Sequence, residues 1–272
     1  MLTIQRKENI MIRQRFFLPV IFFVLVMPVL GIAQSSVEAA SYSQQDVKSL
    51  LSAFMSYADL RILSVQQSLE ILASTTEVRS GNWGNMEDLL RSYQQSDEGL
   101  VVWYVRPDGT YYTGDKGLID KTLSDRSYFP DLISGKKITG ALVISKSTGQ
   151  RSAVIAVPVK KDGKVVGAVG TSLFLDKLSV QIDVALDLPP DVTFFALAPN
   201  GLTTLHRKKE RHFLDPRELG SETLKKAANE MLSETAGKTT YEFDNVTKHA
   251  LYRTSALTQW KFAIAFSTAP QK

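Results

Sequence analysis

The stretch VVWYVRPDGTYYT, residues 101–113, sets two β-rich runs on either side of an Asp-Gly turn. Because Asp and Gly both tolerate positive φ, this pattern predicts a β-hairpin. The stretch TFFALAPNGLTTL, residues 193–205, repeats the pattern, with Pro199-Asn200-Gly201 in the place of Pro107-Asp108-Gly109. An internal repeat of this kind predicts two related sheet units in one chain.

Each repeat is followed by a pair of longer apolar runs that are typical of strands. In the first unit these runs are Ser152–Val159 and Lys164–Leu175, joined by the turn Asp162-Gly163. In the second unit they are Lys248–Leu257 and Trp260–Ser267. Each unit therefore has enough strands for an antiparallel sheet.

A long helix is predicted ahead of the first repeat, over residues 43–75. Its apolar residues recur in steps of three, four or a multiple: Val47, Leu51, Phe54, Ala58, Val65, Leu69 and Leu72. This spacing places them on one face of a helix. Ser43, with Asp46 three residues later, is a capping signal at the start.

Shorter elements complete the pattern. Gly81–Asn85 is predicted as a loop from its turn residues, and Met86–Gln95 as a second helix. Leu178–Leu188 links the two units, and Pro189-Pro190 ends that segment as a rigid break. In the second unit, Glu222–Glu234 is predicted as a helix.

The first 33 residues have the features of an export signal. Arg13 and Arg15 precede the uncharged run FFLPVIFFVLVMPVLGIA, residues 16–33, which ends in small residues. The run can be a cleaved signal peptide or an uncleaved anchor, because its length is at the lower limit for a membrane span. In both cases the rest of the chain is expected outside the cytoplasmic membrane. It would be a periplasmic or secreted protein if residues 16–33 are removed, and a membrane-anchored one if they are kept.

Charge and composition exclude several kinds of function. The chain has 272 residues and no cysteine, which excludes disulfides, thiolate metal sites and cysteine nucleophiles. Its 32 basic and 28 acidic side chains give a net charge of +4, most of which lies in residues 1–33. A body close to neutral argues against nucleic acid as a partner.

Catalytic and metal-binding motifs are absent from the sequence. There is no Gly-x-Ser-x-Gly, His-Glu-x-x-His or P-loop pattern. The three histidines are His206, His212 and His249, and the run HRKKERH, residues 206–212, is predicted to be a solvated loop. We therefore expect no catalytic residues, no metal and no cofactor.

The first unit carries several short motifs in order. They are Asp125-Arg126-Ser127-Tyr128-Phe129, Ser145-Lys146-Ser147-Thr148-Gly149, Val157-Pro158-Val159, the run 162–167, and Leu173 and Leu175 with Leu178. Together with the long helix they resemble the double Cache family of extracytoplasmic sensor domains, over residues 43–268. The resemblance implies an α+β fold, with a long N-terminal helix followed by two PAS-like antiparallel-sheet subdomains.

The resemblance also implies how the chain is divided. After the signal or anchor, residues 1–33, come the helices in 34–99. Residues 100–188 would form the membrane-distal Cache subdomain, with the ligand pocket and a linker. Residues 189–272 would form a smaller, membrane-proximal, PAS-like subdomain.

A small-molecule pocket is implied in the first unit, with Arg126 as its central residue. An arginine amid aromatic side chains can bind a carboxylate through two hydrogen bonds; the alternative is a structural arginine that pairs with Asp125 or caps a carbonyl. Six further residues are candidate pocket walls: Tyr128, Phe129, Trp103, Tyr112, Ser145 and Ser172. Trp103 and Tyr104 lie on opposite faces of one strand, and Trp103 is favoured for the pocket.

The sequence departs from the amino-acid-binding members of the family. Where they have Trp-Tyr after Arg-x, this chain has Tyr128 and Phe129, and where they have an Asp it has Ser172. An α-ammonium would lack its charged partner, so a carboxylate or a neutral polar ligand is favoured over an α-amino acid.

The predicted function is that of an exported sensor module of the Cache type. The sequence after the last strand leaves no room for an output domain, so we expect it to signal through a membrane receptor in trans. The alternative is a structural or interaction protein with a Cache-like fold that has lost its ligand. A homodimer through the helix 43–75 is the expected self-association.

Overall fold

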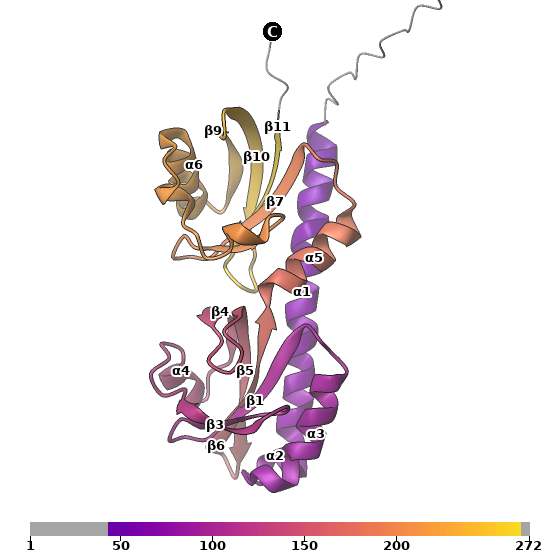
Figure 1. Cartoon of the computed structure of the whole chain (residues 1–272), viewed down its shortest axis with the longest axis vertical. Helices are drawn as coiled ribbons and strands as arrows, with labels where there is room; N and C mark the ends of the chain where they lie inside the picture. Colours follow the sequence, from indigo (N-terminus) through magenta and orange to yellow (C-terminus); the bar gives the residue numbers. More distant parts are fainter. Residues whose placement is uncertain (1–42, 268–272) are drawn as a thin grey trace, which may run out of the picture. The chain divides into compact units, whose positions relative to one another are not determined.

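The computed structural model describes residues 43–267, which belong to one compact unit of the chain. The predicted export signal lies outside the described residues. Within residues 43–267, no helix combines the length and the apolar character that crossing a membrane requires. Figure 1 shows a long helix beside two antiparallel sheets that follow one another in the chain. The predicted α+β fold is confirmed.

The long helix α1 spans Gln44–Ser74. At its start the Ser43 side chain accepts a hydrogen bond from the Asp46 backbone N–H, and the Asp46 carboxylate accepts one from Ser43 in return. This reciprocal cap satisfies donors that the first turn leaves unpaired. At the other end Thr75 is extended, and its hydroxyl caps the short helix α2, Thr76–Arg79. The predicted limits of the long helix are therefore confirmed.

One face of α1 is buried along its whole length. The buried residues are Val47, Leu51, Phe54, Ala58, Ile62, Val65, Leu69 and Leu72. At 3.6 residues per turn their spacing puts them in one row, which packs against both sheets. This tertiary packing provides most of the stability of the helix.

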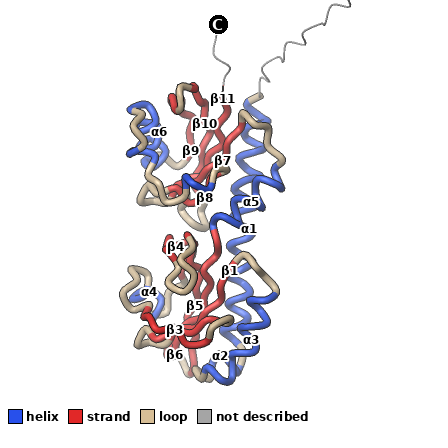
Figure 2. The backbone as a smooth tube through the Cα atoms, in the orientation of Figure 1, coloured by secondary structure: helices blue, strands red, loops and turns tan. Residues whose placement is uncertain are grey.

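The first sheet has six antiparallel strands in the order β3-β2-β1-β6-β5-β4 (Figure 2). Its strands are β1 Leu100–Val105, β2 Thr110–Thr113, β3 Gly117–Thr122, β4 Ile138–Ile144, β5 Arg151–Lys161 and β6 Lys164–Phe174. Helix α1 and helix α3, Trp83–Gln95, cover one face, and the short helix α4, Phe129–Ile133, packs on the other.

The second sheet has five antiparallel strands in the order β8-β7-β11-β10-β9. Its strands are β7 Val192–Leu197, β8 Thr203–His206, β9 Ala236–Phe243, β10 Val246–Thr254 and β11 Lys261–Ser267. Helix α1 packs on one face, and α6, Glu222–Ser233, on the other. Helix α5, Leu175–Leu186, leads from the first sheet to the second and lies against α1. Two short 3₁₀ turns, Lys209–Arg211 and Pro216–Glu218, follow β8.

The interior consists of three apolar clusters. The largest joins the buried face of α1 to the helix-facing side chains of both sheets. Phe54 lies at its centre, with its ring 4.9 Å from the rings of Phe194 and Phe262. The two smaller clusters lie under α4 in the first unit and under α6 in the second.

Two local predictions need correction. Helix α3 begins at Trp83 and not at Met86, because the Asn82 side chain accepts the Gly84 N–H and caps the helix three residues earlier. The linker after the first sheet is a regular helix, α5, which ends where Asp187 takes a left-handed conformation, φ 44°. Pro189 and Pro190, which were expected to end the segment, follow after Leu188.

Candidate functional site

A small cavity lies on the α4 side of the first sheet. Side chains from strands β1, β2, β4 and β6, from the loop between β3 and α4, and from the loop after β4 line it. The lining residues are Trp103, Tyr111, Leu123, Arg126, Tyr128, Val143, Ser145, Lys146, Ser147 and Ser172. The free space that remains is about 10 Å³, about enough for one water molecule. The protein's own side chains therefore fill most of this site.

The floor of the cavity is set by the pairing of β1 with β6. Trp103 lies opposite Gly170, two residues from Ser172 on the same strand face. A Cβ at Gly170 would come within 2.4 Å of the Trp103 ring, so only glycine leaves room for the indole. Tyr104 points to the opposite face, where its hydroxyl donates to the Val166 carbonyl. The preference for Trp103 over Tyr104 thus agrees with the structure.

Arg126 lies in the loop between β3 and α4. The loop is fixed by backbone hydrogen bonds from Arg126 to the Leu123 carbonyl and from Phe129 to the Arg126 carbonyl. The guanidinium Nη2 donates to the Ile144 carbonyl at 2.7 Å. Its Nε is buried and has no hydrogen-bond partner among the described residues. The carbonyl-capping alternative is therefore correct for one nitrogen, and a second nitrogen is left unsatisfied.

A second unsatisfied group lines the same cavity. The hydroxyl of Tyr111, a residue only 2% exposed, is buried and has no partner among the described residues. Burial raises its pKa, and the nearby Arg126 charge acts in the opposite direction. Burial also raises the pKa of Tyr128. Both phenols are therefore neutral hydrogen-bond donors at neutral pH, and leaving a donor unpaired in the interior costs about 1–3 kcal/mol.

Lys146, which lines the cavity, takes part in an ion pair. The Lys146 ammonium donates to both carboxylate oxygens of Asp125, at 2.5 and 2.6 Å, and to the Thr122 carbonyl at 2.6 Å. The bond to Lys146 lowers the pKa of Asp125. Asp125 therefore pairs with Lys146 and not with Arg126, and no other carboxylate among residues 43–267 forms an ion pair with the arginine.

The structure brings together five of the seven predicted site residues: Arg126, Tyr128, Trp103, Ser145 and Ser172. The prediction that Phe129 walls the cavity is wrong, because Phe129, the first residue of α4, is not among the lining residues and packs in the apolar cluster under that helix. Five lining residues were not predicted: Tyr111, Leu123, Val143, Lys146 and Ser147. The sequence signal for Lys146 is its position beside Ser145 in the Ser-x-x-Thr-Gly turn.

The prediction for Tyr112 is also wrong. Its ring stacks on Trp83 at 4.8 Å, on the helix-covered face of the sheet. The reason is the length of the hairpin loop: Arg106 pairs with Thr110 around a three-residue turn, and Val105 lies opposite Tyr111. A two-residue Asp-Gly turn would have moved the register by one residue and exchanged the faces.

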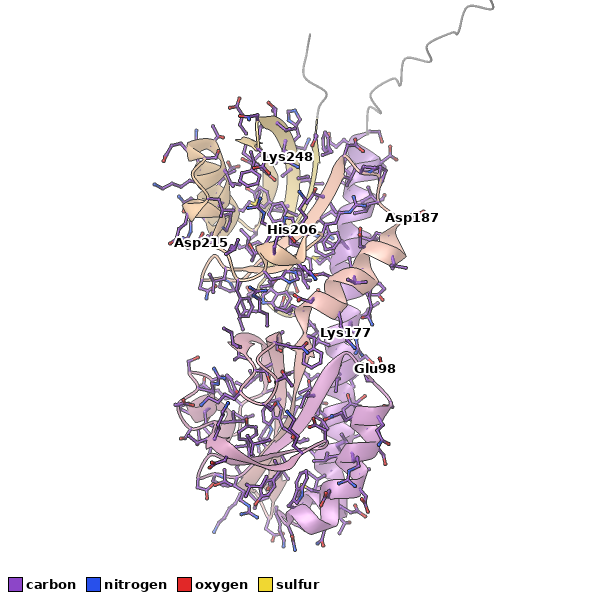
Figure 3. All side chains as sticks on the ribbon, viewed as in Figure 1. Glu98, Lys177, Asp187, His206, Asp215 and Lys248 are labelled. Atoms are coloured by element: carbon purple, nitrogen blue, oxygen red, sulfur yellow. The ribbon has the colours of Figure 1, made fainter. Side chains whose placement is uncertain are left out.

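The HRKKERH run is not fully solvated, which corrects another prediction. His212 is completely buried, while His206 (labelled in Figure 3) is partly buried. The His212 ring contacts the Ser179 hydroxyl at 3.0 Å through Nε2 and the Asp176 carboxylate at 2.6 Å through Nδ1. Its Nε2 also accepts the His206 backbone N–H at 3.2 Å.

Ser179, His212 and Asp176 are hydrogen-bonded in the same sequence as a hydrolytic triad. The surroundings of the three side chains indicate a structural role instead. Ser179 is 4% exposed, so its hydroxyl has no room for a substrate. The basic nitrogen of His212 already accepts a backbone N–H, which competes with its use as a general base. The three side chains tie α5 to the loop after β8. Within residues 43–267, no three His, Asp or Glu side chains are grouped closely enough to hold a metal ion.

Comparisons with known proteins identify the fold. No family model and no curated protein matches this sequence. Among solved structures, the extracellular domain of a protein described as the histidine kinase rpHK1S-Z16 has a TM-score of 0.68 at 19% identity, over 82% of this chain and 94% of that one.

Two further structures are similar over most of their length. The sensory domain of the Campylobacter jejuni chemoreceptor Tlp3, solved with isoleucine bound, has a TM-score of 0.62 at 14% identity, over 82% of this chain and 92% of that one. The sensor domain of the V. cholerae histidine kinase DctB has a TM-score of 0.64 at 12% identity, over 83% and 97%. At these identities the likeness establishes the fold, which is that of extracellular double Cache sensor domains.

Proposed function

We propose that this chain, which has the double Cache fold, is an exported, non-catalytic sensor module that binds a small polar molecule beside Arg126. The observation that carries the proposal is the pair of unsatisfied donors, Arg126 Nε and the Tyr111 hydroxyl, in one closed cavity. A ligand that accepts from both would remove the cost of leaving them unpaired. The solved structures with this fold come from extracellular sensor domains, which supports the same role.

The lining favours a carboxylate or a neutral polar ligand. Its charged groups are the cations Arg126 and Lys146, and its hydroxyls include Ser145 and Ser172. No carboxylate lines the cavity within the described part of the chain, so an α-ammonium would have no charged partner there. The Tlp3 domain was solved with isoleucine bound, which carries an α-ammonium group. The ligand proposed here carries no ammonium group.

Binding requires the cavity to open, because about 10 Å³ admits no metabolite. The closure depends on the Lys146–Asp125 pair, in which the Asp125 side chain is 60% exposed. Water screens the charges of an ion pair this exposed, so a ligand can displace it at small cost. We infer that Lys146 turns toward a bound anion and reports occupancy by releasing Asp125.

The Arg126→Ala variant is expected to bind its ligand about 10–100-fold more weakly, because it loses a charge-assisted hydrogen bond of about 1.5–3 kcal/mol. The measurement is a thermal-shift screen of organic acids, amino acids, amines and purines on the full chain. Arg151→Ala is the matched control, since Arg151 is exposed and does not line the cavity. A Tyr111→Phe variant tests the second donor without removing the ring.

The proposal fails if no compound raises the melting temperature of the parent chain. It fails equally if a stabilising compound acts on Arg126→Ala as strongly as on Arg151→Ala. In either case the alternative gains: a structural or interaction protein with a Cache-like fold, whose filled cavity no longer binds a ligand.

We also propose that the chain self-associates through α1, and that a membrane receptor in trans reads the occupied state. Leu60 and Ile71 are 65% and 68% exposed on the face of α1 opposite the core. Tyr57, 36% exposed, is two heptads before Ile71, a spacing that returns to the same side of a paired helix. Export to the periplasm or beyond, with residues 16–33 removed or kept as an anchor, is part of the proposal.

A Leu60→Glu/Ile71→Glu double variant is expected to convert a dimer into a monomer, because two charges would be placed at the helix pair. Sedimentation velocity of the full chain measures this. The control Lys225→Glu, at an exposed position of helix α6, should sediment as the parent does. A parent chain that is monomeric at all concentrations contradicts the α1 dimer.

A further inference from the structure

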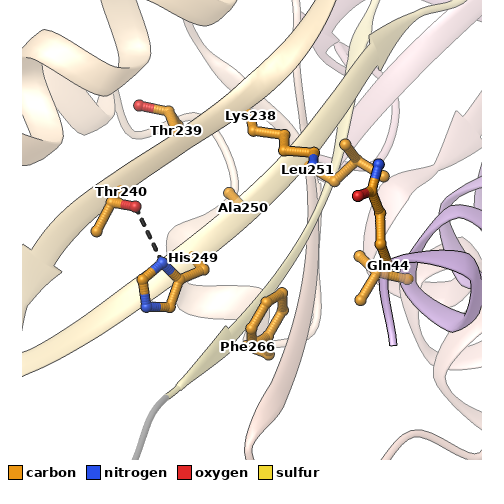
Figure 4. A pocket seen from close by; sticks show the side chains of 9 residues that line it. Gln44, Lys238, Thr239, Thr240, His249, Ala250, Leu251 and Phe266 are labelled. Carbon is orange, nitrogen blue, oxygen red and sulfur yellow. Dashed lines mark hydrogen bonds between the residues drawn. The ribbon is translucent and has the colours of Figure 1, made fainter. Parts of the chain in front are cut away.

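A groove runs between the first half of α1 and the outer strands of the second sheet (Figure 4). It consists of two adjoining cavities of about 280 and 270 Å³, which share Leu251 as a wall. Strand β9 is the edge of the sheet, and α1 packs on β10 and β11 further in. The groove therefore lies on the outer strands of the second sheet, beside α1. The cavity of Arg126 lies on the first sheet.

The strand register explains which side chains reach the groove. His249 pairs with Thr240, Leu251 with Lys238, and Arg253 with Ala236. Since alternate residues share a face, His249, Leu251 and Arg253 all point to the α1 side, together with Lys238. Figure 4 shows Lys238, Leu251 and His249 from the sheet near Gln44 of α1.

The groove has an apolar base. Val47 and Leu51 contribute from α1, and Leu251 and Phe266 from the sheet. Val47 and Leu51 are buried at 5% and 3% exposure, whereas Leu251 is only partly buried. A methylene chain that lay on these side chains would remove apolar surface from water, worth about 25 cal/mol for each Å².

Three cations at the groove have no acidic partner. Lys48, Lys238 and Arg253 line it, and none of them makes an ion pair within residues 43–267. Arg253 donates through Nη2 to the Ser52 hydroxyl at 3.2 Å, while its Nε is buried and unsatisfied among the described residues. No Asp or Glu of the described residues lines either cavity.

Thr240 and His249 add a pair of polar side chains to the lining. The Thr240 hydroxyl and His249 Nδ1 are 3.0 Å apart (dashed in Figure 4). This contact holds the imidazole in place and leaves Nε2 with no hydrogen-bond partner in the described part of the chain. His249 can therefore add a hydrogen bond to whatever the cations attract.

We propose that this groove is a second ligand site, which binds a free monocarboxylate with an unbranched apolar chain of medium length. The carboxylate lies between Lys238 and Arg253, and the chain lies over Leu251 and Val47. Unpaired cations around an apolar base fit an anion with an apolar body, and the groove volume is of the size that small ligands occupy.

The test uses isothermal titration calorimetry on the full chain with octanoate as the probe. Acetate has the same carboxylate without the chain, and octylamine has the same chain with the opposite charge. Octanoate is expected to bind at least about tenfold more tightly than either, since each lacks one of the two contributions. Lys238→Glu and Lys48→Glu should each weaken octanoate binding about 10–100-fold, and Lys225→Glu on α6 should not.

Three results would overturn the proposal. They are no measurable octanoate binding, binding that acetate or octylamine matches, and binding that Lys238→Glu and Lys48→Glu leave unchanged while both variants remain folded by circular dichroism. The Arg126→Ala variant separates the two sites, because it should bind octanoate as the parent does. If Arg126→Ala no longer bound octanoate, octanoate would bind in the first cavity. The outcome of the thermal-shift screen therefore does not decide the outcome of this titration.

Discussion

The Phe54→Ala variant is expected to be about 3–5 kcal/mol less stable than the parent chain. Phe54 is completely buried on α1, with Phe194 and Phe262 at 4.9 Å on the second sheet. Removing the ring would leave a cavity whose walls belong to a helix and two strands, which limits how far they can collapse. Urea unfolding followed by circular dichroism measures the loss.

Val184→Ala is the control for Phe54→Ala. Val184 is an apolar residue on helix α5 that is 76% exposed, so its effect on the free energy of unfolding should stay within about 0.5 kcal/mol. A Phe54→Ala variant that loses less than about 1 kcal/mol would show that the α1 cluster does not hold the second sheet. Because that cluster contains residues of both sheets, we also expect far-UV dichroism and tryptophan fluorescence to report one transition.

The elements that the sequence predicted well are those with a strong local signal. Helix α1 shows both a capping box and a continuous apolar row, and strand β1, Leu100–Val105, ends at a glycine turn. The strands that were missed, β3, β4 and β9, are sheet edges. Their side chains are largely exposed or half-exposed, so they lack the apolar alternation from which a strand is recognised.

The candidate site shows a limit of another kind. The side chain of Tyr112 lies on the face opposite to the predicted one, because one additional residue in a turn exchanges the faces of a strand. Composition and spacing favour neither the two-residue nor the three-residue loop strongly enough to decide between Tyr111 and Tyr112. Residues held by the backbone of their own loop, such as Arg126 and Ser145, were correctly grouped because their motif is local.

The burial of His212 depends on contacts that are remote in sequence. Its own neighbours are Lys209, Glu210 and Arg211, which favour a solvated loop. Its partners Ser179 and Asp176 come from α5, more than thirty residues earlier. A buried polar side chain is stable only where such partners exist, and a single sequence does not show which helix will supply them.

Acid is expected to destabilise the protein through His206. Burial of its ring lowers its pKa to about 3, and the positive charges of Arg211, Lys208 and Lys248 act in the same direction (Figure 3 labels His206 and Lys248). In the unfolded chain a histidine has a pKa of about 6.5. Below that pH the unfolded state binds a proton that the folded state does not, so stability falls as the pH falls toward 3.

The expected loss is about 1.4 kcal/mol for each pH unit below 6.5, or about 2.5 kcal/mol between pH 6.5 and pH 4.5. Urea unfolding of the parent and of His206→Asn at both pH values measures it. Asparagine keeps a side-chain acceptor for the Lys208 N–H, which His206 Nδ1 accepts at 2.7 Å, but it does not titrate. The difference between the two chains therefore isolates the histidine, because their carboxylates are the same.

A second variant tests the cause of the shift. Lys208→Gln removes one of the charges that oppose protonation, so the pKa of His206 should rise and the acid loss should shrink while the ring stays in place. If His206→Asn loses as much stability as the parent between pH 6.5 and pH 4.5, the ring is not the source of the acid sensitivity. If Lys208→Gln instead deepens the loss, the positive charges do not act on His206 in the way its surroundings imply.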